Sequence, residues 1–364
     1  MKVFEATAEG GHEQVLFAMD ADSGLRAIIA IHSTALGPAL GGTRFYPYPS
    51  EEDALADALR LSRAMTRKNA AAGLDLGGGK GVILGDPRTA KGERLLRAYG
   101  RAIDSLGGRY ITAEDVGTTQ ADMEMIARET AFVTGTGQDA GGSGDPSPAT
   151  ARGLLAAMRG VARFLWGAPA LAGRHVAIQG VGKVGGGLAR LLAEAGARLT
   201  IADVNETALR AVATEVGAEV AGAGAIHATA CDLFAPCALG GALTAQTVPE
   251  LRCGAVVGSA NNQLADDAIA VDLAERQVLY VPDFIVNAGG VVNISEEVGQ
   301  EYRAERADRR VDRLEATTLD LLERSRARGV TPLVEAIDRA ERRIRSAGGL
   351  RLQERSRSRT AKPI

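Results

Sequence analysis

The sequence predicts an α/β protein with two domains. At 364 residues the chain exceeds the usual size of a single compact core. Strand-like and helix-like hydrophobic patterns alternate along most of its length. The segment from Gly135 to Pro148 is so rich in Gly and Pro that it predicts a loop between two alternating regions. We therefore expect one domain at 1–134 and a second at 135–329.

The overall composition is that of a globular protein without a strongly charged partner. Hydrophobic residues make up 46% and charged residues 24%, and the formal net charge is −3. This balance predicts binding neither to nucleic acid nor to a membrane surface. The three cysteines contain no Cys-x-x-Cys pair, so neither a disulfide framework nor a metal site is expected. The amino terminus lacks a signal-peptide pattern, and a reduced, cytoplasmic location is the expectation.

The first domain is expected to contain a hairpin, two helices and two further strands. Branched apolar residues broken by turn formers predict the hairpin. Ser50, followed three positions later by Asp53, predicts a capped helix start. The expected elements are a hairpin over 15–32, helices over 50–65 and 90–106, a strand over 81–84, and a strand from Tyr110 that ends near Asp115.

A glycine-rich stretch over 73–80 ends in a lysine that leads into an apolar strand. It is not a P-loop, because Leu74 occupies the position six before Lys80 where glycine is needed, and Gly81 follows where a hydroxyl is needed. Two interpretations stay open from these residues alone. The lysine either contacts a ligand beside the close backbone of the glycines, or it is a solvated charge at a turn.

A second glycine-rich segment has the full context of a dinucleotide-binding motif. A strand from Arg174 precedes the Gly-x-Gly-x-x-Gly pattern, and a helix over 186–195 and a strand over 198–203 follow. The glycines admit a pyrophosphate to the free N–H groups at the helix start. The alternative is that they only pack a helix on a strand. The residues expected to bind the cofactor here are Gly180, Gly182, Lys183, Val184 and Gly185.

Asp203 ends the second strand of this unit, twenty-one residues after Gly182. Its carboxylate would accept hydrogen bonds from the adenosine ribose and repel a 2′-phosphate, so NAD is expected rather than NADP. The second domain is therefore predicted to be a Rossmann-type, doubly wound dinucleotide-binding domain. Further short strands are expected at 222–227, 232–236, 255–263 and 278–283.

The carboxyl-terminal third is expected to begin with a glycine turn and to continue as charged helices. The turn falls within 284–295, and the helices cover 296–327 and 332–346. Helices at about 330–348 are expected to return to the first domain. The basic segment 349–364 is expected to be disordered, with no nucleic-acid role.

A nicotinamide cofactor implies hydride transfer, and the acid/base residues distinguish the reaction classes. Hydroxy-acid dehydrogenases use a histidine, but the four histidines here fall in early strands or in the nucleotide domain. The unusual polar residues in glycine-rich settings are instead Lys68, Lys80 and Asp115. A hydroxy-acid dehydrogenase on a similar scaffold and an inactive NAD-binding regulator are the alternatives.

Six motifs extend over nearly the whole chain apart from the basic tail: 37–45, 68–80, 112–118, 144–148, 235–239 and 282–290. In this order they resemble the leucine, valine and phenylalanine dehydrogenases, relatives of glutamate dehydrogenase. The resemblance implies reversible, NAD-dependent oxidative deamination of an L-amino acid to a 2-oxo acid and ammonium, in a cleft between a substrate domain and the Rossmann-type domain. It also implies a homo-oligomer, with dimer or octamer and the physiological direction left open.

The resemblance also implies residue roles. Lys68 would hold the substrate carboxylate, Lys80 would be the general base that activates water, and Asp115 would shuttle protons to the departing amine. Glycine turns at Gly41-Gly42 and Gly77–Gly79 would leave room for the small zwitterion. Positions near the nicotinamide would be Arg44, Thr150, Ala260, Asn261 and Asn287.

The side-chain pocket implied by the resemblance is apolar. Leu40 stands where glutamate-specific relatives carry a lysine, so an acidic substrate is disfavoured. Met65, Ala113, Val291 and Ile294 match the other substrate-binding positions. A branched aliphatic substrate is therefore expected, with valine favoured over leucine and isoleucine. Phenylalanine or another amino acid is the alternative.

Overall fold

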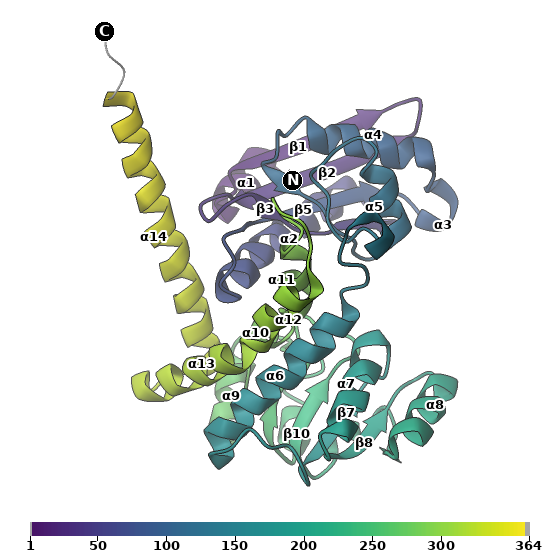
Figure 1. The fold of residues 1–364 in the computed structure, drawn as a ribbon, viewed down its shortest axis with the longest axis vertical. Helices are drawn as coiled ribbons and strands as arrows, with labels where there is room; N and C mark the ends of the chain where they lie inside the picture. The colour runs from purple at the N-terminus through teal and green to yellow at the C-terminus, as the bar shows by residue number, and fades with distance from the viewer. Residues whose placement is uncertain (1, 361–364) are drawn as a thin grey trace. The chain divides into compact units, whose positions relative to one another are not determined.

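The computed structural model describes residues 2–360, and the chain divides into two compact units (Figure 1). The first unit comprises Met1–Asp145, Ile294–Arg303 and Arg339–Ile364, and the second comprises Pro146–Asn293 and Ala304–Asp338. Residues 361–364, at the end of the predicted basic tail, lie outside the described residues.

The boundary between the units lies eleven residues later than the sequence predicts, after Asp145 instead of after residue 134. Loop residues 135–145 belong to the first unit because Glu297, also in that unit, holds them in place. The backbone N–H groups of Gly135 and Ser143 each donate to Glu297 Oε1 at 3.0 Å. The Gly- and Pro-rich loop is therefore attached to the first unit, and the second unit begins at Pro146.

The first unit is built on a six-stranded mixed sheet with the order β1-β2-β5-β3-β6, and β4 also pairs with β5. The predicted hairpin is confirmed, because β1 and β2 pair in antiparallel register from Gln14 with Ile31 to Asp20 with Leu25. β5 is antiparallel to β2 and parallel to β3 and β4. The strands are β1 (Gln14–Asp20), β2 (Leu25–Ser33), β3 (Ala39–Leu40), β4 (Thr43–Tyr46), β5 (Gly77–Leu84) and β6 (Tyr110–Ile111).

One long helix, α2, covers one face of this sheet, which we call the α2 face. Its apolar side chains Leu55 and Leu59 pack with Ile28 of β2 and Val82 of β5. The predicted cap is confirmed, since the side chain of Ser50 accepts the backbone N–H of Asp53 at 3.1 Å. The helices of the first unit are α1 (Val3–Gly10), α2 (Glu51–Ala71), α3 (Pro87–Ala90), α4 (Glu93–Asp104), α5 (Gln120–Ile126) and the 3₁₀ helix η1 (Gln138–Ala140).

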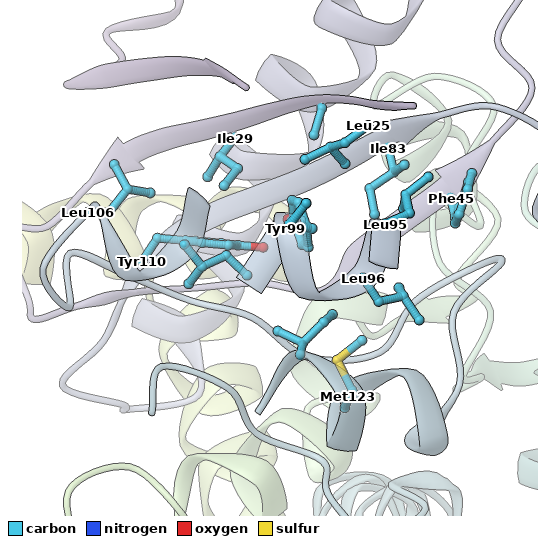
Figure 2. Close-up of a cluster of buried hydrophobic side chains, with 14 of the residues drawn as sticks. Leu25, Ile29, Phe45, Ile83, Leu95, Leu96, Tyr99, Leu106, Tyr110 and Met123 are labelled. Atoms are coloured by element: carbon cyan, nitrogen blue, oxygen red, sulfur yellow. The ribbon is translucent and has the colours of Figure 1, made fainter. Parts of the chain in front are cut away.

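The opposite face of the sheet carries the main hydrophobic core of the first unit, where α4 and α5 supply side chains. Figure 2 shows Leu95, Leu96 and Tyr99 of α4 beside Ile29 and Ile83 of the sheet. Tyr99 is completely buried among these apolar side chains. Both faces of β5 are therefore covered, which makes any polar residue on this strand unusual.

The second unit contains a fully parallel sheet with the order β12-β11-β10-β7-β8-β9. This is the doubly wound order in which the first strand of the unit, β7, lies between the two halves. The predicted Rossmann-type arrangement is confirmed. The strands are β7 (His175–Gln179), β8 (Arg198–Ala202), β9 (Glu219–Val220), β10 (Cys231–Pro236), β11 (Cys253–Val256) and β12 (Leu279–Tyr280).

The second unit begins with α6, a helix of 20 residues that starts at the domain boundary, and further helices alternate with the strands. The division between the units passes through α11 and through α14, each of which is continuous. The elements are α6 (Ser147–Trp166), α7 (Lys183–Glu194), α8 (Glu206–Val216), η2 (Ile226–Ala228), η3 (Val248–Glu250), α9 (Ile269–Glu275), α10 (Asp283–Val286), α11 (Gly289–Ser295), α12 (Ala304–Asp312), α13 (Leu314–Arg328) and α14 (Pro332–Thr360).

Two predicted elements of the second unit are wrong. The strand expected at 222–227 is a loop leading into η2, where Ile226 is completely buried in the core. The glycine turn expected within 284–295 is helical, as α10 and α11. Gly289 and Gly290 serve close helix packing, since a Cβ on Gly289 would lie 2.1 Å from the carbonyl oxygen of Ala149.

The helices at the carboxyl end also differ in extent from the prediction. Residues 296–303 are not helical, and the charged helices begin with α12. In α14, Arg343 contacts Asp75 of the first unit, with Nη2 2.7 Å from Oδ1. α14 ends at Thr360, within the segment 349–364 for which disorder is predicted. Within residues 2–360, no helix has the length and apolarity needed to cross a membrane.

Candidate active site

Lys80 lies in the middle of β5, on the α2 face of the sheet. Side chains alternate between the two faces of a strand, so Lys80 shares its face with Gly78 and Val82. Val82 is part of the apolar cluster with α2, and Lys80 itself is only 5% exposed. A buried charge in such a place is costly unless an opposite charge compensates it.

Asp115, in the turn after β6, supplies the opposite charge through an ion pair with Lys80. Burial lowers the pKa of Lys80 below its usual value, and the nearby Asp115 opposes this effect without cancelling it. Burial alone would raise the pKa of Asp115, but Lys80 and Arg44 hold it below its usual value. The structure thus brings together the lysine and the acid that the sequence singles out, and the lysine releases its proton more readily than a surface lysine.

The turn that carries Asp115 is held by Thr118, which the sequence patterns do not reveal as a site residue. The backbone N–H of Asp115 donates to Thr118 Oγ1 at 2.8 Å, and this hydroxyl donates to the carbonyl oxygen of Thr43 at 2.8 Å. Gly117 has a φ of 81°, and a Cβ there would lie 1.9 Å from the carbonyl oxygen of Phe45. The Asp-x-x-Thr spacing typical of a side-chain turn is the signal that could have identified Thr118.

The glycines before Lys80 belong to β5 and admit the protein's own groups. A Cβ on Gly78 would lie 2.1 Å from the backbone nitrogen of Thr66 on α2. On the opposite face, a Cβ on Gly79 would lie 2.6 Å from the ring of Tyr110. The space beside these glycines, where a side chain would lie, is filled by α2 and by a tyrosine ring. This space is therefore not the room for a substrate that the sequence predicts.

Gly41 and Gly42, between β3 and β4, are equally close to neighbouring backbone. A Cβ on Gly41 would lie 1.8 Å from the carbonyl oxygen of Gly79, and one on Gly42 would lie 2.5 Å from that of Glu114. These contacts bring the backbones of β5 and of the Asp115 turn together. The glycines consequently position the two charged residues of the site.

The last turns of α2 carry Asn69, Lys68 and Met65, of which Asn69 contacts β5. Asn69 donates its amide to the carbonyl oxygen of Gly77 at 2.5 Å and is completely buried. Its Oδ1 atom is buried without a hydrogen-bond partner. Lys68 and Met65, both partly exposed, lie on the same helix. Asn69 was not singled out from the sequence, although it directly follows Lys68 and its amide fixes the start of β5.

Arg44 of β4 connects the ion pair to α2. Its Nη1 lies 2.9 Å from Asp57 Oδ2, and its Nε lies 3.4 Å from Asp115 Oδ2. Asp57 also accepts from the hydroxyl of Tyr48 at 2.6 Å. The pKa of Asp57 is lowered because Tyr48, Arg60 and Arg44 together outweigh the opposing effect of burial. Arg44 is thus engaged by two carboxylates of the first unit.

The predicted side-chain pocket residues are found in both units. Leu40 and Ala113 lie in the first, where Leu40 is fully buried and pairs with Ile111, two residues before Ala113. Ile294, partly exposed, also belongs to the first unit, whereas the buried Val291 belongs to the second. Leu40 and Ala113 are therefore adjacent apolar residues near the Asp115 turn.

The glycine motif of the second unit follows β7 at the point where the sheet order reverses. Gly180 has a φ of 94°, and a Cβ there would lie 2.8 Å from the backbone nitrogen of Ala238, beyond the end of β10. Gly182 is the N-cap of α7, and no atom lies within 4 Å of a Cβ placed on it. The first N–H groups of any α-helix, here those that follow Gly182, lack acceptors within the helix itself. This open helix start fits the pyrophosphate of a dinucleotide.

Asp203 lies just beyond the carboxyl end of β8 and is linked to the glycine motif. Its Oδ2 accepts from the backbone N–H of Val181 at 2.7 Å, and its Oδ1 accepts from that of Asn205 at 2.8 Å. The carboxylate is thereby fixed beside the motif. This is the position from which an acidic residue contacts a ribose in dinucleotide-binding domains.

Three further predicted residues also lie at the carboxyl edge of this sheet. Asn261 follows β11, and its Oδ1 accepts from Asn287 Nδ2 at 2.8 Å. Asn287 also donates to the carbonyl oxygen of Ser259 at 3.2 Å, and its Oδ1 is buried without a hydrogen-bond partner. Ala260 is buried beside them. Thr150 lies in α6, where its hydroxyl donates to the carbonyl oxygen of Pro146 at 2.9 Å.

The residues that the structure describes contain no group of three or more His, Cys, Asp or Glu side chains that could hold a metal ion. Cys237 is close to the glycine motif, and its Cβ would lie 3.1 Å from a Cβ on Gly185. Burial raises the pKa of Cys237 above its usual value. This thiol therefore packs the motif and is a poor nucleophile.

Comparison with known proteins identifies the family. Residues 12–132 match the model of the Glu/Leu/Phe/Val dehydrogenase dimerisation domain, and residues 141–211 and 199–344 match that of the glutamate/leucine/phenylalanine/valine dehydrogenases. The chain belongs to this amino-acid dehydrogenase family. The resemblance drawn from the sequence motifs is confirmed. The protein is accordingly an oxidoreductase of the amino-acid dehydrogenase class, in a family that uses NAD or NADP.

Individual relatives are similar over most of the chain. A leucine dehydrogenase of Geobacillus stearothermophilus is 50% identical over 86% of this chain and 85% of its own. A valine dehydrogenase of Streptomyces virginiae is 49% identical over 93% and 95%. The crystal structure of L-tryptophan dehydrogenase from Nostoc punctiforme, 41% identical, has a TM-score of 0.83 over 95% of this chain and 99% of that one.

Proposed function

We propose that this dehydrogenase catalyses the reversible, NAD-dependent oxidative deamination of a branched aliphatic L-amino acid, with valine preferred over leucine and isoleucine. The observation that carries the proposal is the buried ion pair of Lys80 and Asp115, an amine and a carboxylate held together on a covered sheet face. Relatives named leucine and valine dehydrogenases, about equally similar to this chain, support the substrate class.

The reaction removes a hydride and a proton from the amino acid and then adds water to the resulting imine. Lys68 binds the substrate carboxylate. Lys80, in its neutral form, takes a proton from the water that attacks the imine carbon, which its lowered pKa favours. Asp115 receives and returns the protons of the departing amine, so that ammonium and the 2-oxo acid leave. Activity therefore rises toward alkaline pH as Lys80 loses its proton.

The bound nicotinamide supplies the hydride acceptor for this reaction. The open start of α7 at Gly182 holds the pyrophosphate, and Asp203 favours the unphosphorylated ribose of NAD over that of NADP. Asn261 and Asn287, with Ala260 and Thr150, line the part of the cofactor site that would hold the nicotinamide. The buried, unpartnered Oδ1 of Asn287 is available to accept from the cofactor.

The apolar residues Leu40 and Ala113, with Met65, Val291 and Ile294, set the substrate preference. A completely buried leucine at position 40 excludes a second substrate carboxylate. Because one methylene changes discrimination by only about 1–3 kcal/mol, leucine and isoleucine are also accepted. The enzyme acts as a homo-oligomer in the cytoplasm, with the edge strand β1 as the contact between copies.

The decisive experiment measures kcat/KM for valine, leucine, isoleucine, phenylalanine, tryptophan and glutamate with NAD and with NADP. We expect the highest value for valine with NAD, no turnover of glutamate and no turnover of 2-hydroxyisovalerate. Preference for an aromatic substrate would overturn the proposed specificity. NADH binding without turnover of any amino acid would instead indicate a regulator.

The role of Lys80 is tested by Lys80→Ala, with Lys91→Ala as the matched control. Lys91 is also ion-paired in the first unit, but its partner is Asp122, at 2.7 Å. We expect Lys80→Ala to lower kcat by about 10²–10⁴-fold, the usual contribution of a general base, and a small primary amine to restore part of it. Unchanged activity in Lys80→Ala would exclude the assigned role.

A further inference from the structure

Behind the Lys80–Asp115 pair, charges of alternating sign continue from the sheet into α2. Arg44 follows Asp115, and Asp57 follows Arg44, at the distances given above. Arg60 then approaches the outer side of Asp57, with Nη2 2.7 Å from Oδ1. The order from the sheet outward is thus Lys80, Asp115, Arg44, Asp57 and Arg60.

Arg44 occupies its position because of strand alternation in β4. Thr43 directs its hydroxyl to the opposite face, where it lies 2.7 Å from the hydroxyl of Tyr99 and 2.6 Å from that of Thr112. Its neighbour Arg44 consequently lies on the α2 face, beside the register partner Val82. The guanidinium is thereby placed against a carboxylate of the helix and a carboxylate of the site.

The contact between Arg44 and Asp115 is electrostatic. Arg44 Nε lies 3.4 Å from the carboxylate oxygen but is buried without a hydrogen-bond partner. Asp57, in contrast, receives a hydrogen bond from Arg44 Nη1. Asp57 therefore holds the arginine, and the arginine presents a positive charge to Asp115 and Lys80.

We propose that Arg44 and Asp57 are positioning residues that set the charge state of the Lys80–Asp115 pair. This inference rests on the proposed function, in which Lys80 is the base. Arg44 favours the ionised form of Asp115 and the neutral form of Lys80, which is the combination that the reaction needs. Asp57 opposes the electrostatic effect of Arg44 on Lys80, and it holds the Arg44 guanidinium in one place. The assignment differs from the expectation that Arg44 contacts the nicotinamide.

The charged groups from Lys80 to Arg60 come from β4, β5, α2 and the turn after β6. Lys80 is on β5, Arg44 on β4, Asp115 in the turn after β6, and Asp57 and Arg60 on α2. Tyr48, which follows β4, donates to Asp57. On the other side of β5, the hydroxyl of Tyr99 faces Gly81, and burial raises the pKa of this tyrosine, so it stays neutral.

Removing the charge of Arg44 and removing the charge of Asp57 shift the pKa of Lys80 in opposite directions. Loss of the Arg44 charge raises the pKa values of both Lys80 and Asp115, since Arg44 lowers them. Loss of the Asp57 charge lowers that of Lys80, since Asp57 raises it. A unit charge about 4 Å away, at an effective dielectric constant near 20, shifts a titration by up to about three pH units, and a charge farther away shifts it less. Because the pair titrates as a coupled unit, the measured quantity is the apparent acid limb of the rate profile.

The experiment compares the pH profiles of kcat/KM for valine in the wild type, Arg44→Gln, Asp57→Asn and Arg60→Gln. We expect the acid limb to move to higher pH in Arg44→Gln and to lower pH in Asp57→Asn. Arg60→Gln is the matched control, because Arg60 touches the same carboxylate but its side chain is 57% exposed, so solvent screens its charge. It should leave the acid limb in place.

A purely structural role would lower kcat in both variants without moving the acid limb, and this result would overturn the inference. Shifts of the same sign in Arg44→Gln and Asp57→Asn would overturn it as well. The Kd of NADH, measured by fluorescence, should be unchanged in Arg44→Gln, and a large increase would return Arg44 to a cofactor role. An active Lys80→Ala enzyme would contradict the proposed base instead, which separates the two failures.

Discussion

His12 and His32 lie edge to face, with ring centroids 4.9 Å apart, where α1 and β2 meet α2. His32 Nε2 donates to the carbonyl oxygen of Gly10 at 3.1 Å, and its Nδ1 lies 2.8 Å from the hydroxyl of Thr66. His12 Nε2 donates to the carbonyl oxygen of Leu59 at 3.0 Å. Each ring therefore directs one nitrogen at a carbonyl oxygen of a neighbouring segment.

This pair predicts a loss of stability in mild acid. Burial lowers the pKa of both rings, and for His32 to about 4, with His12, Arg63 and Arg67 adding to the effect. The unfolded chain binds protons near pH 6.5 and the folded chain does not, so stability is complete above pH 6.5 and falls as the pH drops toward 4. We expect a loss on the order of 2 kcal/mol after allowing for partial exposure.

The measurement is the urea midpoint at pH 7.5 and at pH 5. The difference should shrink in His32→Gln, which cannot take up a proton. His227→Gln is the control, because His227 lies in the second unit beside Glu250 and should leave the difference unchanged. An equal loss of stability in the wild type and in His32→Gln would contradict the assignment.

The second prediction concerns Gly182, the only cofactor-motif glycine around which a side chain has space. Gly182→Ala should leave the thermal midpoint unchanged, because no atom lies within 4 Å of the new Cβ and the φ of −64° suits alanine. It should raise the Kd of NADH at least tenfold, because the methyl group lies where the pyrophosphate approaches. Gly222→Ala, equally open, is the control and should bind NADH normally. Normal binding by Gly182→Ala would place the pyrophosphate elsewhere.

Features that depend on residues close together in the sequence are predictable from it, whereas features that depend on distant residues are not. Gly180 to Gly185 and Asp203 were predicted because strand, turn and helix follow one another within thirty residues. The need for glycine at positions 79 and 81 is not predictable in this way. It arises because the side chains of Tyr110 and Tyr99, from other elements, pack against β5 at these positions. The pairing of Arg44 with Asp57 likewise depends on how α2 lies on the sheet, which no local pattern states.

Short elements in the second unit illustrate the same limit. Gly289 and Gly290 have the composition of a turn, but close packing against α6 makes them helical. The segment 222–227 is apolar enough for a strand, yet Ile226 fills the core as part of η2. In both cases tertiary packing decides between conformations that the local sequence permits.

The third prediction tests cofactor choice through Asp203→Asn. The amide keeps an oxygen that accepts from Val181 N–H, so the motif is retained while the charge is lost. We expect the preference for NAD over NADP, as a ratio of kcat/KM values, to fall by about tenfold, which corresponds to about 1.4 kcal/mol of removed repulsion toward the 2′-phosphate. Asn205→Ala, which leaves the carboxylate in place, is the control. A ratio unaffected by Asp203→Asn would mean that another group selects the cofactor.

The fourth prediction concerns the edge strand β1, which pairs only with β2 within the sheet. Phe17 and Met19 lie on the same face of this strand and are 53% and 82% exposed. Monomeric proteins rarely leave large apolar side chains exposed on an unpaired edge strand. In a two-fold dimer formed through this edge, the same strand of each copy meets the other, so Met19→Lys brings two like charges together. We therefore expect Met19→Lys to lower the sedimentation coefficient of the oligomer at micromolar concentration while the circular dichroism spectrum stays unchanged. Val204→Lys, at a site 90% exposed in the second unit, should sediment as the wild type does. An oligomer that withstands Met19→Lys at the same concentration would place the contact on a different surface.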